Sequence, residues 1–117
     1  MDAQRAIHTF EASLQSESAT PDFGADDREA FLIDQRNKLR SLAIPPRAVT
    51  AKPSEWAKSH GEFADSTYKM IAIAGENGHW LLYDPDTEMF SLANGTLDGE
   101  LELVGFRSTD ALAEWCG

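Results

Sequence analysis

The chain has 117 residues, of which 42% are apolar and 26% charged, and its formal net charge at neutral pH is −10. A chain of this length is expected to form one domain, and its apolar content is too high for a disordered protein. The negative charge repels phosphate groups, so we expect neither nucleic acid nor an anionic membrane surface as a partner.

Most of the negative charge belongs to the second half of the sequence. Residues 59–117 contain eleven Asp and Glu but two basic residues, Lys69 and Arg107, whereas residues 1–58 contain nine acids and eight bases. If the acids of the second half share one surface, that surface attracts cationic partners.

Two amphipathic helices are expected in the first part of the chain. In the first helix, apolar residues recur at steps of four, three and four, at Ala3, Ile7, Phe10 and Leu14. Residues 16–25 have a loop composition, and the second helix is expected over about 27–43.

Prolines end the second helix and begin a segment without a clear pattern. Pro45 and Pro46 stop the helix. The Pro-containing stretch 44–53 is not assigned to a helix or a strand, and Ser54 can cap a short helix that ends near Gly61.

From residue 66 the pattern is that of β-strands. Strands are expected at about 67–74, 79–83, 88–93 and 100–106. The first and second are joined by Asn77-Gly78, a strong hairpin signal, and the second and third by a turn over residues 84–87 that begins with Asp-Pro. Short connections of this kind predict an antiparallel meander.

The last segment is expected to be a helix, which Ser108 or Thr109 can cap and which places Ala111, Leu112 and Trp115 on one face. Helices and strands are thus segregated along the chain, which predicts an α+β fold. We expect a single domain over residues 1–117: a mainly helical part at 1–62, then a sheet and a final helix at 66–117. The N-terminal helices and the C-terminal helix would pack on a four-stranded antiparallel meander.

No metal site or cofactor is expected. The acidic segment 84–88 begins like a calcium loop, but the Gly and Glu that such a loop needs at its sixth and twelfth positions are replaced by Met89 and Gly95. The three histidines, His8, His60 and His79, lack zinc-ligand spacing, and the single Cys116 cannot form an internal disulfide.

No catalytic motif is found either. The glycines at 75 and 78 join two strands, so they do not form a phosphate-binding loop, and no G-x-S-x-G nucleophile elbow occurs. We therefore expect a protein that is not an enzyme.

The acids of the strands and turns are the candidate partner-binding residues. Carboxylates on a rigid scaffold can present a fixed field, although a solvated face that keeps the protein soluble is the alternative interpretation. Trp56 could be an exposed binding anchor or a core residue. The full candidate set is Trp56, Glu76, Asp84, Asp86, Glu88, Asp98, Glu100 and Glu102.

The second half resembles the SUKH superfamily, small α+β domains found largely among bacterial immunity proteins. The resemblance covers about residues 66–117. It lies in the aromatic-rich strand from Gly78 to Asp84, the acidic turn and strand that follow, and the closing segment from Phe106 to Trp115 with its Ser-started helix. It implies a protein that binds and neutralises a toxin, and an acidic inhibitor fits a basic toxin such as a nuclease.

The expected function is therefore that of an acidic immunity protein that blocks the active site of a cationic toxin. The first alternative is a small-ligand or regulatory module with an apolar pocket of a few hundred Å³ between the N-terminal helices and the sheet. The second is an enzyme that uses a carboxylate or His79. A cytoplasmic location is expected, because the start lacks the features of a secretion signal and the longest apolar run is Met70 to Ala74.

Overall fold

The computed structural model describes residues 3–15, 28–60, 63, 65–104 and 107–116. The loop expected over 16–25 lies outside the described residues, and so do the side chains of Trp56, His60 and Cys116.

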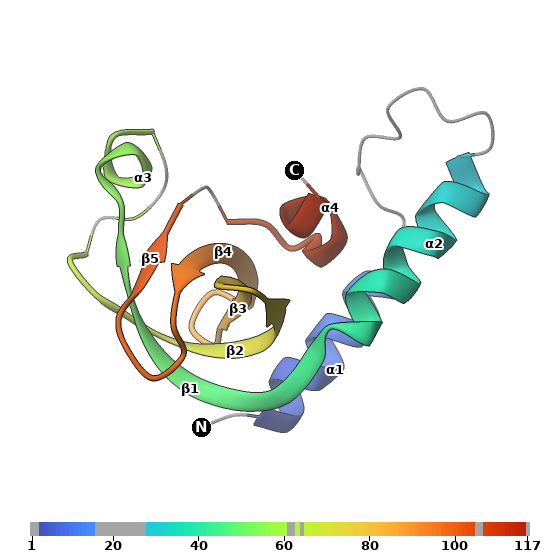
Figure 1. Cartoon of the computed structure of the whole chain (residues 1–117), viewed down its shortest axis with the longest axis horizontal. Helices are drawn as coiled ribbons and strands as arrows, with labels where there is room; N and C mark the ends of the chain where they lie inside the picture. The colour runs from blue at the N-terminus through green and yellow to red at the C-terminus, as the bar shows by residue number, and fades with distance from the viewer. Residues whose placement is uncertain (1–2, 16–27, 61–62, 64, 105–106, 117) are drawn as a thin grey trace.

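The fold is α+β, as the sequence predicted, with two helices before the sheet and one after it (Figure 1). In chain order the elements are α1 (Ala3–Gln15), α2 (Arg28–Ser41), β1 (Ala43–Pro53), α3 (Glu55–His60), β2 (Tyr68–Glu76), β3 (His79–Asp84), β4 (Met89–Gly95), β5 (Leu101–Leu103) and α4 (Ala111–Cys116).

The sheet has five strands and closes into a barrel in the order β1-β2-β3-β4-β5, so the prediction of a four-stranded meander was wrong in strand number and closure. The additional strand, β1, is the segment that the sequence left unassigned. Its prolines Pro45 and Pro46 lie where the register with β2 shifts, so they take no ladder position that needs an N–H donor. Beyond them Val49, Ala51 and Pro53 alternate as buried residues.

A short parallel pairing between β1 and β5 closes the barrel. Ala51, Lys52 and Pro53 lie opposite Leu101, Glu102 and Leu103, and the Ser54 N–H donates to the Leu103 carbonyl at 2.9 Å.

The barrel wall is buried on both faces. Toward the interior pack residues such as Met70, Ala72 and Leu82, and toward the helices pack Ile71 and Tyr83. This double burial explains the uninterrupted apolar run from Met70 to Ala74, which a half-exposed strand would not have.

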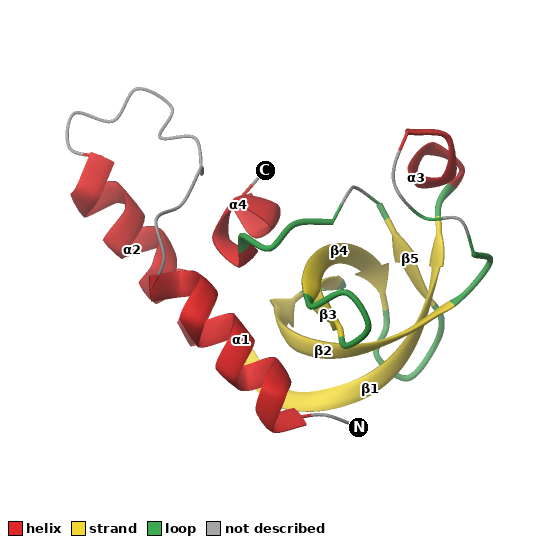
Figure 2. Cartoon of the chain, turned by 180° about the vertical axis from the view of Figure 1, so that it is seen from behind, coloured by secondary structure: helices red, strands yellow, loops and turns green. Residues whose placement is uncertain are grey.

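Helices α1, α2 and α4 lie on one side of the barrel, with α4 between α2 and the strands, whereas α3 lies on the other side, against β1 (Figure 2). In α1 the buried residues are Ala6, Phe10 and Leu14, whereas Ile7 is 47% exposed. The predicted apolar face of this helix, which included Ala3 and Ile7, is therefore rotated toward Ala6.

The C-terminal helix begins at a cap that differs from the predicted one. The Ala113 N–H donates to Asp110 Oδ1 at 3.0 Å, so Asp110 caps α4 rather than Ser108 or Thr109. Ser13 of α1 adds a second link, because its hydroxyl accepts from the Ala111 N–H at 2.8 Å. These bonds fix where α4 sits on the sheet.

Candidate binding pocket

A pocket of about 460 Å³ opens between α4, β4 and the β2–β3 hairpin. Such a volume is in the range of small-molecule sites. It lies on the outer face of the barrel, beside α4, because this six-residue helix covers part of that face. The lining residues are Glu76, Asn77, His79, Leu92, Ala93, Asn94, Val104 and Trp115.

The hairpin that forms one wall is determined by local sequence. Asn77 and Gly78 have φ angles of 50° and 81°, as the tight Asn-Gly turn predicted from the sequence requires. Gly75 has a φ of 146°, and a Cβ there would lie 2.2 Å from the His79 carbonyl oxygen. Glycine at this position therefore lets β2 approach the start of β3.

The polar rim of the pocket is a row of residues across the outer face of the barrel. In the strand register Glu76 of β2 lies opposite His79 of β3, His79 opposite Asn94 of β4, and Asn94 opposite Glu102 of β5. Opposite residues on neighbouring strands have Cβ atoms about 5 Å apart and point to the same face. Two carboxylates thus flank the His79–Asn94 pair. The Glu76 carboxylate lines the pocket, and the Glu102 carboxylate lies one strand beyond Asn94.

The His–Asn pair is held by a hydrogen bond. His79 Nδ1 and Asn94 Oδ1 are 2.8 Å apart. Because an amide oxygen can only accept, the Nδ1 atom carries the proton, and in a neutral ring the Nε2 atom is then an acceptor.

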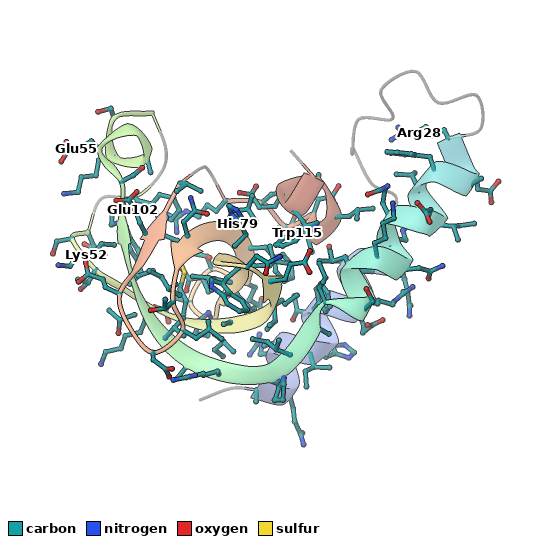
Figure 3. The ribbon with its side chains drawn as sticks, viewed as in Figure 1. Arg28, Lys52, Glu55, His79, Glu102 and Trp115 are labelled. Atoms are coloured by element: carbon teal, nitrogen blue, oxygen red, sulfur yellow. The ribbon has the colours of Figure 1, made fainter. Side chains whose placement is uncertain are left out.

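The floor of the pocket is apolar. Leu92 and Ala93 come from β4, Val104 from the segment after β5, and Trp115 from α4. The Val104 N–H donates to the Leu92 carbonyl at 3.2 Å, which holds the segment after β5 against β4. Figure 3 shows Trp115 on α4 and His79 on the barrel beside it, with Glu102 and Lys52 farther along the barrel.

Beside the pocket, Glu114 is a carboxyl group with altered acidity. Burial raises its pKa from 4.5 to about 7, although a hydrogen bond with the Leu92 backbone lowers the pKa in part. The Glu114 carboxyl therefore changes charge near neutral pH. It directly precedes Trp115, which lines the pocket.

The pocket has an acidic electrostatic character. Of the eight lining residues that the structure describes, Glu76 is formally charged, and none is Lys or Arg. Within the described part of the chain neither Glu76 nor Glu102 forms an ion pair, and the whole chain is strongly acidic.

The structure divides the predicted partner-binding acids between two ends of the barrel. Asp84, Asp86 and Glu88 lie at the β3–β4 turn, while the other four lie near the opposite end, at Glu76, Asp98, Glu100 and Glu102. The six residues of β3 separate these ends by about 17 Å. The expectation of one contiguous acidic surface is therefore not met.

Three of the predicted acids pair with bases from the first half of the chain. Glu88 accepts from Arg5 Nε at 2.7 Å, Glu100 pairs with Lys52 at 3.0 Å, and Asp98 pairs with Arg47. Neighbouring opposite charges cancel much of each other's field at a distance. These ion pairs therefore make the negative field of the second half weaker in the folded protein than the sequence alone suggests.

Asp84 is buried, which corrects the expectation that it faces solvent. Its residue is 4% exposed, one carboxylate oxygen accepts from the Asp86 N–H at 2.9 Å, and the other lies 3.8 Å from the Arg107 guanidinium. The predicted turn is confirmed, and the Asp84 side chain stabilises it from within. The proposed anchor Trp56 has a side chain that lies outside the described residues, so its binding role stays a prediction.

Sequence reasoning missed most of the pocket. Trp115 was placed on the apolar face of the last helix, His79 was considered as a metal ligand or as a residue of an enzyme, and Asn94 was not among the candidate residues. Part of the signal was present in the second hairpin, because the turn between β3 and β4 sets His79 opposite Asn94. The position of α4, which supplies Trp115, depends on long-range contacts that no local pattern reveals.

Among the described residues, no cluster of three or more His, Cys, Asp or Glu side chains could hold a metal ion. In the same part of the chain, none of the helices has the length and apolar character needed to span a bilayer. Comparison of the chain with family models, curated proteins and solved structures finds no match. The resemblance to the SUKH superfamily thus stays a prediction.

Proposed function

We propose that this protein is a binding module whose small ligand occupies the pocket between α4 and the β2–β3 hairpin. The observation that carries the proposal is the pocket itself, with its volume of about 460 Å³, an apolar floor and a few polar groups on one rim. This combination is typical of sites that bury an apolar ligand body and orient it through a few hydrogen bonds. It corresponds to the module expected as the first alternative, except that the helix at the pocket is α4 and not an N-terminal helix.

Ligand-observed NMR with a library of small aromatic and aliphatic compounds tests this function. In Val104→Phe, a larger side chain fills part of the pocket, so we expect the compounds that bind the wild-type protein to lose binding. The control is Ile7→Phe, since Ile7 is 47% exposed on α1 and does not line the pocket. Equal binding to both variants would refute the proposal.

A second candidate function is the neutralisation of a cationic toxin, as expected from the sequence. The observation that favours it is the net charge of −10 together with exposed acids that form no ion pair in the described part of the structure: Glu76, Asp86 and Glu102. In this proposal the carboxylates speed association with a basic protein in the cytoplasm, and the bound inhibitor blocks its active site.

Charge reversal tests the second candidate. The wild-type protein and a variant with all three acids changed to Lys are used to capture partners from a lysate of the native host. A basic protein retained by the wild type and lost by the variant supports this function. The rate at which this basic protein associates with the wild type should fall with added salt, and its rate of association with the variant should depend less on salt.

A further inference from the structure

The rim of the pocket offers groups suited to a positively charged ligand. Glu76 supplies a carboxylate at the pocket edge, and Glu102 supplies another one strand beyond Asn94. Of these two exposed side chains neither forms an ion pair within the described residues. A ligand cation would therefore gain an ionic partner without displacing a base of the protein.

Hydrogen bonding at the rim agrees with this charge. With Nδ1 directed to Asn94, the neutral His79 ring presents Nε2 as an acceptor, which suits an N–H donor of the ligand. The side-chain amides of Asn77 and Asn94 also contain donors, so the hydrogen-bonding groups of the rim are compatible with several classes of ligand. The charge selects among them, because an anionic ligand would meet carboxylates, and the described lining residues include no Lys or Arg.

The floor favours an ammonium group attached to an apolar body. Leu92 and Val104 provide aliphatic contacts, and Trp115 provides an aromatic surface that attracts cations as well as apolar groups. A volume of about 460 Å³ is larger than an ammonium ion alone would need, so the apolar body fills most of the pocket.

We propose that the ligand of this pocket is a compact apolar amine, whose ammonium group is bound by Glu76 and the His79–Asn94 pair while its apolar part contacts Leu92, Val104 and Trp115. The inference rests on the proposed binding function and adds the chemical class of the ligand. The same ammonium chemistry could come from a free amine or from a lysine side chain of a peptide.

Calorimetric titration with three probes of similar shape tests the ligand class: 2-phenylethylamine, the neutral 2-phenylethanol and the anionic 3-phenylpropionate. We expect the amine to bind about tenfold more tightly than the alcohol, and the carboxylate to bind more weakly than both. Nα-acetyl-lysine methylamide is a fourth probe. Tighter binding of this probe than of the free amine assigns the ammonium to a peptide, and weaker binding assigns it to a free small molecule.

Two variants separate local recognition from the general field of an acidic protein. Glu76→Gln should weaken amine binding about three- to tenfold and leave alcohol binding unchanged. Glu55→Gln removes one negative charge from α3, which Figure 3 shows on another part of the barrel. This variant should change neither the amine affinity nor the alcohol affinity. An equal loss in both variants overturns the local recognition.

The outcomes distinguish failure of the inference from failure of the proposed function. If amine and alcohol bind equally to the wild type, and Val104→Phe abolishes both, the pocket is a binding site but its selectivity for amines is refuted. If no probe binds, or Val104→Phe leaves binding intact, both the function and the inference are overturned. The probe series uses the unmodified protein, so its result does not depend on the folding of a variant.

Discussion

His79 of β3 and Asn94 of β4 lie directly opposite each other, and the imidazole Nδ1 donates to the amide oxygen across 2.8 Å. The bond fixes which ring nitrogen is left for a ligand, and His79 lines the pocket that α4 helps to form. Removing the partner should therefore affect binding more than folding.

Replacement of Asn94 tests this relationship. Asn94→Ala should lower the affinity for 2-phenylethylamine about threefold or more, because His79 loses its fixed orientation, while stability changes by about 0.5 kcal/mol for an exposed hydrogen bond. Asn94→Asp keeps the acceptor and adds a negative charge, so it should strengthen amine binding. Calorimetric titration and thermal unfolding measure the two effects. Unchanged affinity in Asn94→Ala would show that the pair does not orient the ring for the ligand.

Gly75 should be intolerant of any side chain. Its φ of 146° and the predicted 2.2 Å approach of a Cβ to the His79 carbonyl mean that Gly75→Ala forces β2 and β3 apart. We expect a loss of about 2 kcal/mol or more in the free energy of unfolding, measured by urea denaturation. Gly99→Ala is the matched control, since a Cβ there would meet the movable Thr96 hydroxyl and should cost less. Similar losses in the two variants would contradict the close approach.

Glu114 should make stability depend on pH. Its pKa is raised from 4.5 to about 7 by burial, so between these values the folded protein binds more protons than the unfolded chain. The stabilising contribution of the protonated carboxyl is complete below about 4.5 and is lost as the pH rises through 7. After allowance for solvent screening of a partly exposed group, the effect is about 1–2 kcal/mol.

The variant Glu114→Gln isolates this effect, because its amide oxygen can still accept from the Leu92 backbone but carries no charge. Relative to the wild type, the variant should gain about 1–2 kcal/mol in unfolding free energy between pH 4 and pH 8. Urea denaturation at the two pH values measures the difference. Parallel pH profiles for the two proteins would mean that the Glu114 carboxyl does not change its protonation on folding.

Asp84 and Arg107 should be coupled energetically. Both side chains are largely buried, at 6% and 15% exposure, and Arg107 also lies 5.1 Å from the centre of the Phe63 ring. Asp84→Asn keeps an acceptor for the Asp86 N–H but removes the buried negative charge that faces the guanidinium, so we expect a loss of about 2–3 kcal/mol.

A double-mutant cycle with Arg107→Met measures the coupling. The double variant should be less destabilised than the sum of the single variants by about 1 kcal/mol or more, because it removes both charges together. Strict additivity of the two losses would contradict an interaction between the buried charges.

Local signals predicted local structure well. The Asn77-Gly78 hairpin and the Asp84-Pro85 turn were predicted because both depend on the conformational preferences of a few neighbouring residues. The cap of α3 was predicted for the same reason, and the Ala57 N–H donates to the Ser54 hydroxyl at 3.1 Å.

Long-range structure could not be read from the same signals. The strand β1 was missed because two consecutive prolines, Pro45 and Pro46, are typical of a loop. In the structure they lie at a register shift, where the ladder needs no backbone N–H donor. Its parallel pairing with β5 joins residues 51 and 101, so no local pattern reports it. The ion pair between Arg5 and Glu88 likewise depends on how α1 packs, and it makes the charge distribution of the sequence a poor guide to the folded surface.

The most direct test of the central claim, that the pocket beside α4 is the binding site, is the mapping of 2-phenylethylamine binding by ¹H–¹⁵N correlation NMR of the whole protein. We expect the largest shifts at the backbone amides of His79, Leu92, Asn94 and Val104 and at the Trp115 indole, with little change at the β3–β4 turn. Shifts centred on that turn, or an unchanged spectrum at saturating amine, would contradict the account.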